Sequence, residues 1–295
     1  MFLRSSQATV VTKEVNESTT KSIALIGGTA DTRPRGLLMK ARRQVLGLVG
    51  VTGFLLLAEL SSRSGVVDPR FLPPASDIVA VLLSNLLHGK FWIAAGQTMQ
   101  AWAIGLAVSI VLGVVLGFGI GSSAVLRRLT NSTVEFLRPI PSVALIPLAV
   151  LLFGVKIESS LMLIIYASFW QVFIQVLYGV ADVDNIAMQT ARSYGLSSMA
   201  RIRYVVFPTT LPYLMTGVRL ATAVALILAV TAGLVIGSPG LGREIALAQS
   251  GGAVPEMYAL AVATGLIGVG INVAMRSVER RVLSWHSSVR SEAIV

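Results

Sequence analysis

The sequence predicts an all-α integral membrane protein with about six transmembrane helices. Of its 295 residues, 54% are hydrophobic and only 13% are charged, whereas soluble globular domains average roughly 25% charged residues. A chain so poor in charge cannot cover its surface with polar groups, so its main solvent should be lipid. Apolar stretches of about 20 residues, the length that crosses a bilayer, recur between short connectors rich in Pro, Gly, Lys and Arg.

The chain divides into three parts. Residues 1–43 form a polar, basic leader that we expect to be disordered and cytoplasmic, because it contains no sustained apolar run. Residues 44–285 form the transmembrane domain, and residues 286–295 form a cytoplasmic tail. The first span is expected at 45–60, with Glu59 close enough to its end to reach water.

A short amphipathic helix is expected after the first span. The pair Pro73-Pro74 stops any preceding helix. Either Ser76 or Asp77 can then cap a helix over 78–87. This segment is too short to span a bilayer, so we place it at the membrane interface.

The second span is expected at 91–120. It carries Gly113 and Gly117, a pair of small residues four positions apart that permits close helix contact. We favour packing within the chain over a dedicated dimer face for this pair. Arg127 and Arg128 then mark a short cytoplasmic loop.

The third segment, 134–153, contains Pro139, Pro141 and Pro147. Two interpretations stay open. Either the helix starts only after Pro141, or the segment is a broken helix that lines a pathway. Because proline has no N–H, a carbonyl that would accept a hydrogen bond from that position has no donor in the helix. At membrane depth such a carbonyl must face protein or a wet cavity.

Three further spans are expected at 159–180, 211–236 and 257–278, with a Gly-rich loop at 237–243 and a short helix at 244–249. Six spans place both termini on one side of the membrane. That side carries 18 Lys and Arg residues and the other carries 5, with Arg219 left out of the count. The positive-inside rule therefore makes both termini cytoplasmic.

The connector 181–210 is the longest on the cytoplasmic side. Asp182 or Asp184 can cap a helix over 185–194, and Gly195 can follow in the left-handed conformation that often ends a helix. Ser197 or Ser198 can cap a second helix over 199–206, with Pro208 and Pro212 bounding the entry to the next span. Because an ordinary connector needs only a few residues, this 181–210 loop predicts an interface with a partner.

The residues of this loop resemble the EAA motif found in permease subunits of ABC importers. The usual leading Glu of the motif is Gln189 here, which leaves a predicted ion pair to the ATPase in doubt. The matching positions are Gln189, Thr190, Ala191, Gly195, Ile202 and Pro208. The chain also resembles the nitrate, sulfonate, taurine and bicarbonate branch of these permeases over about 70–290. The residues that carry this resemblance are Phe71 to Ser76, Leu137 to Pro141, Ile146 to Leu148, Val205 to Pro208, Leu211-Pro212, Gly240 to Gly242 and Glu279 to Trp285.

The resemblance implies a type I ABC importer permease fold in a bacterial inner membrane. Two copies of the permease would form the pathway, and each would seat its 181–210 loop in one of two ATP-binding subunits. ATP and Mg²⁺ would bind to those subunits, so this chain would be neither an enzyme nor a holder of cofactors. An extracytoplasmic substrate-binding protein would deliver the solute, a small anion or small organic compound.

Other functions have less support. A secondary transporter or a channel not coupled to ATP is the main alternative, but Glu59 and Glu135 both lie near predicted span ends, away from the membrane interior where such a transporter needs an ionisable group. The chain has no cysteine, and His88 and His286 lie far apart, so no metal site is expected. The net charge of +10 lies in loops and tails, which suits a membrane protein and indicates no nucleic-acid partner.

Candidate pathway residues lie in the third and fourth segments. Tyr166, Gln171 and Gln175 can present polar groups from one face of a helix, and Pro139 and Pro141 can shape a break beside them. The two glutamines are equally able to hydrogen-bond neighbouring helices. We therefore keep both roles open for them.

Overall fold

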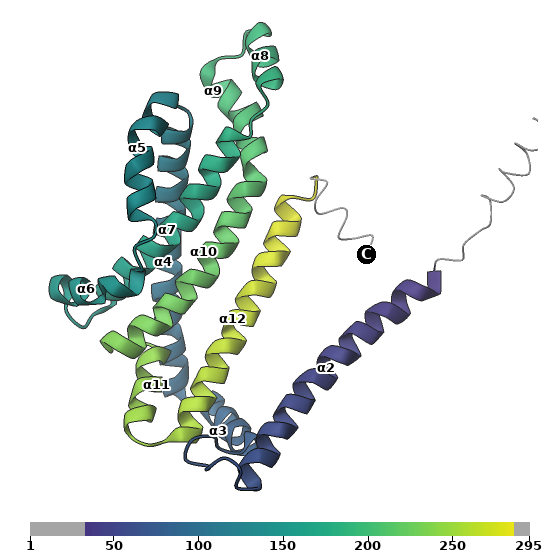
Figure 1. Ribbon diagram of the computed structural model, residues 1–295, viewed down its shortest axis with the longest axis vertical. Helices are drawn as coiled ribbons and strands as arrows, with labels where there is room; N and C mark the ends of the chain where they lie inside the picture. Colours follow the sequence, from purple (N-terminus) through teal and green to yellow (C-terminus); the bar gives the residue numbers. More distant parts are fainter. Residues whose placement is uncertain (1–32, 286–295) are drawn as a thin grey trace, which may run out of the picture. The chain divides into compact units, whose positions relative to one another are not determined.

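A computed structural model describes the backbone of residues 33–285, and the side chains of residues 45–285 except Leu48. This part of the chain is helical and contains no strand (Figure 1). Residues up to Phe54 and residues from Leu55 onward form two separate units. The described part of the first unit is one helical segment, residues 33–54. Every contact discussed below lies in the second unit.

Five helices are long and apolar enough to cross a membrane, and a sixth crossing results when one bent pair is counted as a single span. The described part of the chain thus agrees with the expected number of spans. The elements are α2 (Arg33–Arg63), α3 (Ala75–Leu87), α4 (Gly89–Gly121), α5 (Ala124–Leu137), η1 (Ser142–Leu145), α6 (Ile146–Phe153), α7 (Ile157–Ala181), α8 (Asn185–Ser193), α9 (Ser198–Arg201), η2 (Ile202–Val206), α10 (Phe207–Ile236), α11 (Leu241–Ser250) and α12 (Val254–Val282).

The leader differs in part from the expectation. Helix α2 begins at Arg33, so residues 33–43 are helical, where disorder was expected. Pro34 lies in the first turn of α2, where N–H groups have no acceptor within the helix, so the N–H that proline lacks is not missed. The sequence that follows Pro34 contains good helix formers. Residues 1–32 and the tail 286–295 lie outside the described residues.

The third segment is a broken helix. Helices α5 and η1–α6 meet at an angle of 81° around Arg138–Pro141, where two prolines remove backbone donors. Ser123 caps α5 by accepting a hydrogen bond from the Leu126 N–H at 3.3 Å. Helix α5 therefore starts at Ala124, ten residues earlier than expected, and the predicted loop at Arg127 and Arg128 is wrong.

Helices α4 and α7 pack in parallel through a row of small residues. Each glycine of the row meets a branched side chain of α7, and a Cβ added at Gly113 would lie 2.8 Å from the Cβ of Val172. Packing within the chain therefore accounts for the pair Gly113 and Gly117. The full row pairs Gly105 with Ile164, Gly113 with Val172, Gly117 with Val176 and Gly121 with Val180.

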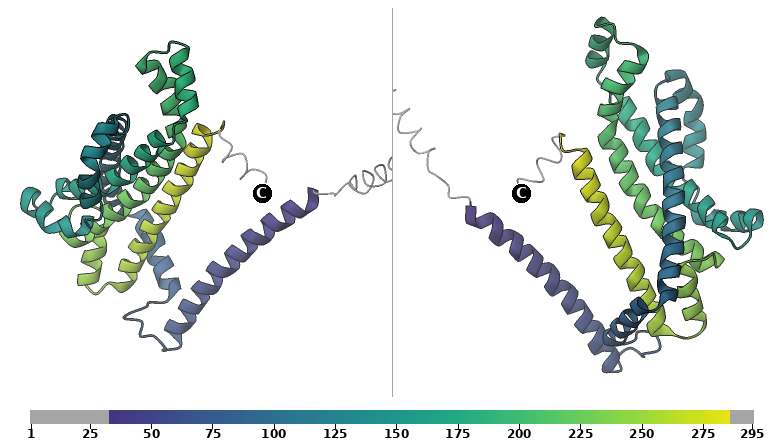
Figure 2. Two further views of the ribbon diagram at one scale, coloured as in Figure 1. Left: turned by 45° about the horizontal axis from the view of Figure 1, so that its top comes forward. Right: turned by 180° about the vertical axis from the view of Figure 1, so that it is seen from behind.

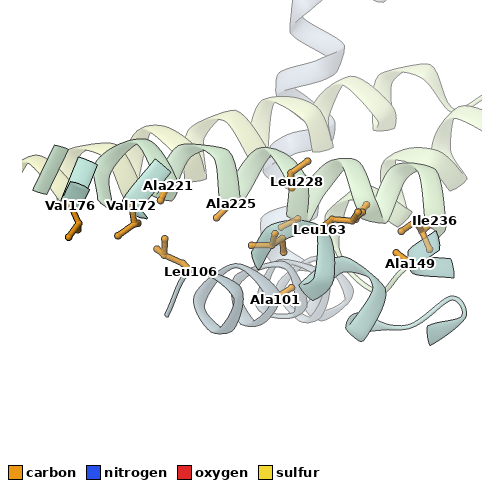
Figure 3. Close-up of a cluster of buried hydrophobic side chains, with 13 residues drawn as sticks. Ala101, Leu106, Ala149, Leu163, Val172, Val176, Ala221, Ala225, Leu228 and Ile236 are labelled. Carbon is orange, nitrogen blue, oxygen red and sulfur yellow. The ribbon is translucent and has the colours of Figure 1, made fainter. Parts of the chain in front are cut away.

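Helix α10 packs against α7 in the opposite direction and completes the main core. Near the α8 end of the pair, a Cβ at Gly179 would lie 2.7 Å from the Thr210 methyl carbon, and further along α10, one at Gly217 would lie 3.0 Å from the Gln171 carbonyl oxygen. Figure 3 shows the buried side chains of α4, α6, α7 and α10 that meet in this core, including Leu163 and Leu228.

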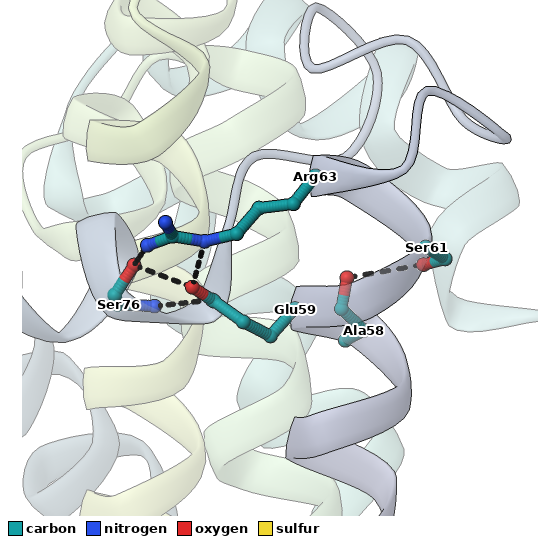
Figure 4. Close-up of polar contacts among 5 residues, drawn as sticks. All are labelled: Ala58, Glu59, Ser61, Arg63 and Ser76. Atoms are coloured by element: carbon teal, nitrogen blue, oxygen red, sulfur yellow. Dashed lines mark hydrogen bonds and ion pairs between the residues drawn. The ribbon is translucent and has the colours of Figure 1, made fainter.

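Helix α3 starts at Ala75 and follows Pro74, so neither expected cap residue caps it. The Glu59 carboxylate at the end of α2 performs that role from outside the helix. It accepts hydrogen bonds from the Ser76 N–H and from the Ser76 hydroxyl, both at 3.0 Å, and pairs with Arg63 at 2.6 Å (Figure 4). A carboxylate is favourable there, because the N-terminus of a helix carries unpaired N–H groups and a partial positive charge.

Candidate functional site

The 181–210 loop projects beyond the ends of α7 and α10, at the end of the molecule opposite α3 and α11 (Figures 1 and 2). Helix α8 covers Asn185–Ser193, close to the predicted range. Asp184 is its cap, and its Oδ1 accepts a hydrogen bond from the Ile186 N–H at 2.8 Å. Asp182 instead accepts a hydrogen bond from the Tyr213 hydroxyl at 2.9 Å, which ties the start of the loop to α10.

Gly195 makes the corner between α8 and α9. Its φ of +71° lies in the left-handed region, as predicted. The Leu196 N–H donates to the Ala191 carbonyl at 3.0 Å and the Gly195 N–H donates to the Arg192 carbonyl at 2.9 Å. This pair of bonds is the Schellman arrangement that closes a helix. The corner is thus a defined structure that satisfies its own backbone groups.

Arg201 holds the far side of this corner. Its guanidinium donates to the Leu196 carbonyl and to the Ser198 hydroxyl, each at 3.1 Å. The Ser197 hydroxyl accepts from the Ala200 N–H at 3.3 Å, so Ser197 is the cap of the second helix. Sequence reasoning used Arg201 only as one of the positive charges of the cytoplasmic side, because a guanidinium that stabilises a turn has no characteristic spacing.

The second loop helix does not stop before Pro208, which corrects the predicted boundary. Helix α9 continues through η2, a turn of π-helix over Ile202–Val206, directly into α10. Pro208 lies in the first turn of α10 and Pro212 lies inside it. Wide π turns occur mostly at functional sites and disturb the regular hydrogen bonding, which makes room for prolines that carry no N–H.

The candidate coupling residues differ in exposure. Gln189 and Thr190 are exposed on α8, whereas Ala191 is only 7% exposed and packs inside the loop. Ile202 is 38% exposed in the π turn and Pro208 is half-buried beside it. Gln189 and Thr190 can therefore meet a partner directly, while Ala191 and Gly195 shape the surface that they present.

Four large, mainly apolar side chains on the loop are exposed, although side chains of this kind are usually buried in a folded protein. Their exposed fractions lie between 67% and 81%, and Ile186 and Tyr194 lie between the two helical stretches Ile157–Ala181 and Ser198–Ile236 that could cross a membrane. Large apolar side chains that neither the chain nor lipid covers mark a protein interaction surface. The sequence reasoning missed these residues, which are Ile186, Tyr194, Met199 and Tyr204.

A cavity of about 370 Å³ lies between the break after α5, helix α7 and helix α10. It brings together three of the five candidate pathway residues, Tyr166, Gln171 and Gln175. Pro139 and Pro141 are not among its lining residues, but they flank Ile140, which is. The complete lining is Arg138, Ile140, Ser142, Tyr166, Ala167, Trp170, Gln171, Ile174, Gln175, Tyr178, Leu220 and Val224.

Tyr166 connects α7 to the break. Its hydroxyl donates to the Leu137 carbonyl at 2.7 Å, and its ring packs edge-on against Trp170 at 6.1 Å between centroids. The side-chain amides of Gln171 and Gln175 are half-buried, and neither has a hydrogen-bond partner among the side chains described from residue 45 onward. They face the cavity and do not join helices to each other.

The chain belongs to the family of binding-protein-dependent transport system inner membrane components, whose model matches residues 109–284. This family defines the class of the protein, a multi-pass membrane permease of an ABC-type importer. An uncoupled secondary transporter or channel, the main alternative, finds no support in this result.

The chain is also similar to individual permeases. It is 27% identical to the taurine transport system permease of Escherichia coli K12, covering 84% of this chain and 92% of that one. It is 27% identical to a putative aliphatic sulfonates permease of Bacillus subtilis, covering 76% and 81%, and 26% identical to a nitrate import permease of Leptolyngbya laminosa, covering 74% of each.

Solved structures support the fold. The chain resembles a structure of the inward-facing MetNI methionine ABC transporter, with a TM-score of 0.55 at 18% identity, covering 63% of this chain and 93% of that one. A structure of an amino acid ABC transporter with histidines also gives a TM-score of 0.55 at 18% identity, covering 65% and 94%. The expected type I importer permease fold is thereby confirmed.

Proposed function

We propose that the 181–210 loop is the site at which an ATP-binding subunit grips this permease. The observation that carries the proposal is the exposure of Ile186 and Tyr194, which lie outside the helices that could cross a membrane, on a loop whose corner at Gly195 has a defined backbone. A rigid surface of this kind suits docking, because little conformational freedom is lost on binding.

The chemistry of ATP belongs to the partner in this proposal. Gly89-Lys90 is followed by Phe91 and lacks the preceding glycine of a phosphate-binding loop. ATP and Mg²⁺ would therefore bind to two ATP-binding subunits, and closure of those subunits would move the loops. Alternating access then follows from rigid bodies whose equilibrium a ligand shifts.

The charge distribution supports a cytoplasmic loop and cytoplasmic termini. Arg192, Arg201 and Arg203 lie in the loop itself, and positive residues concentrate on the cytoplasmic side of membrane proteins. The family name supports placement in an inner membrane. An extracytoplasmic binding protein would then dock at the end that carries α3 and α11.

The pathway would be completed by a second copy of the chain. The sequence shows one coupling loop and no internal duplication, so twofold pairing is the simplest way to engage two ATP-binding subunits. The printed names of the relatives concern taurine, aliphatic sulfonates and nitrate. These names support a small anion or small organic compound as the solute.

Cross-linking tests the docking proposal directly, because the native chain has no cysteine. Met199 is 74% exposed on the loop, and Leu247 is 51% exposed on α11 at the other end. Met199→Cys should cross-link to the co-expressed ATP-binding subunit through a short bifunctional reagent. The matched control Leu247→Cys should not, and equal cross-linking of both variants would contradict the proposed docking site.

A further inference from the structure

Two arginines lie at the level of this cavity, and one of them, Arg219 beside the lining residue Leu220, is paired with Glu279 at 3.3 Å. Helix α5 is 14 residues long, about 21 Å at 1.5 Å per residue, so its far end at Leu137 lies well away from the turn at Gly121–Ser123. The Leu137 carbonyl is bonded by Tyr166, which lies near the middle of the 25-residue helix α7. Arg138 follows immediately and therefore lies near the middle of the span, although the count of 18 cytoplasmic Lys and Arg residues in the sequence included it.

Arg138 has no counter-charge among the side chains that the structure describes. Among the side chains described between residues 45 and 285, none pairs with its guanidinium, and the lining of its cavity contains no acidic residue. Glu135 lies one turn earlier on α5, where it accepts a hydrogen bond from Asn131 at 2.9 Å and does not line the cavity. A charge at this depth is costly unless it serves a pathway or a ligand.

The neighbours of Arg138 in the cavity are uncharged hydrogen-bonding groups. Gln171 and Gln175 lie four residues apart on α7, so both side-chain amides can turn toward the same point. Each amide nitrogen offers two N–H donors, and the guanidinium only donates. Ile140, Ile174, Leu220 and Val224 line the rest of the cavity with apolar surface.

We propose that this cavity holds the solute during transport and selects a small organic or inorganic monoanion. The inference rests on the proposed role of the chain as the importer's pathway. Arg138 binds the negative headgroup, the two glutamine amides donate to its remaining oxygens, and the apolar wall contacts the carbon part. A volume of about 370 Å³ admits on the order of a dozen non-hydrogen atoms, at roughly 30 Å³ per water-sized unit.

The donor set explains why the site takes an anion. A planar guanidinium matches the oxygens of a carboxylate, sulfonate or nitrate with two parallel hydrogen bonds. A cation would meet the like charge of Arg138 with no acidic side chain in the lining to offset it. A neutral molecule would leave that charge uncompensated near the middle of the membrane. The permease itself would then contribute specificity, in addition to the binding protein.

The test measures equilibrium binding to the permease purified with its ATP-binding subunit in lipid nanodiscs, without the binding protein. The probes are ethanesulfonate, nitrate, bicarbonate and benzoate, with ethyl methyl sulfone as a neutral analogue and ethylammonium as a cation. We expect at least one anion to bind and neither control compound to compete with it. Arg138→Gln should weaken that binding at least about 10-fold, as loss of a charge-assisted hydrogen bond implies.

Two further variants make the result specific. Arg138→Lys keeps the charge but cannot make two parallel hydrogen bonds, so it should bind the anion more weakly than the wild type and more tightly than Arg138→Gln. Arg128→Gln removes one charge from the same helix outside the cavity and should change nothing. Absence of binding for all four anions, or equal binding by Arg138→Gln, overturns the inference. If Arg138→Gln fails to assemble, the comparison passes to Arg138→Lys, and an anion affinity equal to that of the wild type in this variant overturns the inference, because the guanidinium then makes no specific contact with the anion.

The same samples separate this inference from the proposed coupling function. Recovery of the ATP-binding subunit with the wild-type permease reports on the 181–210 loop, and anion binding reports on the cavity. Loss of subunit recovery in the wild-type preparation contradicts the coupling function. Full recovery without anion binding contradicts only the cavity's proposed role.

Discussion

Replacement of Gly195 by valine tests whether the shape of the 181–210 loop matters for coupling. Gly195 adopts a φ of +71°, and a Cβ added there would meet no other atom within 4 Å. The substitution therefore introduces no collision with neighbouring side chains. Its entire cost comes from the backbone, because a left-handed conformation brings a Cβ too close to the following carbonyl oxygen.

The size of that cost follows from the conformation. A residue with a Cβ loses roughly 1–2 kcal/mol in the left-handed region, and a β-branched residue belongs at the upper end of that range. An energy of 1–2 kcal/mol corresponds to about a 5–30-fold change in an equilibrium constant. If the ATP-binding subunit requires the native corner, its affinity for Gly195→Val should fall by up to that factor.

The turn between α11 and α12 supplies a closely matched control. Gly252 has a φ of +72° and equally open surroundings. It also closes its helix in the same way, with the Gly252 N–H donating to Gln249 at 3.2 Å and the Ala253 N–H to Ala248 at 2.9 Å. Gly252→Val therefore imposes the same backbone strain at the opposite end of the molecule.

Three measurements on both variants decide the question. The amount of permease in the membrane reports insertion, co-purification reports binding of the ATP-binding subunit, and labelled solute reports uptake. We expect Gly195→Val to insert normally, with reduced subunit recovery and little uptake, and Gly252→Val to keep its subunit. Full transport with full subunit recovery in Gly195→Val would refute the docking role of the loop.

Three other expectations concern packing, the α2–α3 junction and topology. Gly113→Ala should destabilise the purified protein by about 1–3 kcal/mol through overpacking against α7, seen as a lower melting temperature, while Gly119→Ala on the same helix meets open space and should not; equal melting temperatures would contradict the packing described. Glu59→Ala should lower the melting temperature by removing the carboxylate that caps α3, and an unchanged melting temperature would show that the cap is dispensable. In intact cells, an impermeant thiol reagent should label Phe71→Cys but not Arg192→Cys, and labelling at 192 would overturn the orientation.

The local features of the loop could be predicted because they depend on neighbouring residues. Local rules place Gly195 as the corner and restrict each cap to two candidates, Asp182 or Asp184 and Ser197 or Ser198, of which the structure uses Asp184 and Ser197. The end of the second helix could not be placed in this way. By local rules, Pro208 and Pro212 indicate a helix boundary. In the structure, the π turn Ile202–Val206 instead makes α9 continuous with α10, an arrangement that depends on the packing of α10 against α7.

The start of α5 shows a different limit. Arg127, Arg128 and Asn131 make this stretch too polar for a hydropathy argument to recognise as part of a membrane segment. The structure makes it a helix with separate polar and apolar faces, so the break at Pro139 lies deep where the sequence placed it near an end. The depth of Arg138, and with it the charge of the cavity, depends on this one boundary.

The cavity itself was predictable only in part, for the same kind of reason. Tyr166, Gln171 and Gln175 belong to one helix, so their spacing was enough to place them on related faces. Leu220 and Val224 come from α10, which contacts α7 only because the intervening loop returns the chain. No spacing rule joins residues that are fifty positions apart.

The loop and the cavity share the same pair of helices. The 181–210 loop connects the end of α7 to the start of α10, and both helices line the cavity. Gly179 against Thr210 and Gly217 against Gln171 bring the two backbones so close that a methyl group has no room between them. Closely packed interfaces do not deform gradually, so we expect this pair to move as one body when the loop is displaced. Helix α5, which ends at the break next to Arg138, has no buried residue and is bonded to α7 through the Tyr166 hydroxyl and the Leu137 carbonyl, whereas α6 beyond the break packs Ala149 into the core. Movement of the loop should therefore change the distance from Arg138 to the two glutamines and leave the α7–α10 pair unchanged, which would loosen the hold on an anion at the moment the pathway opens.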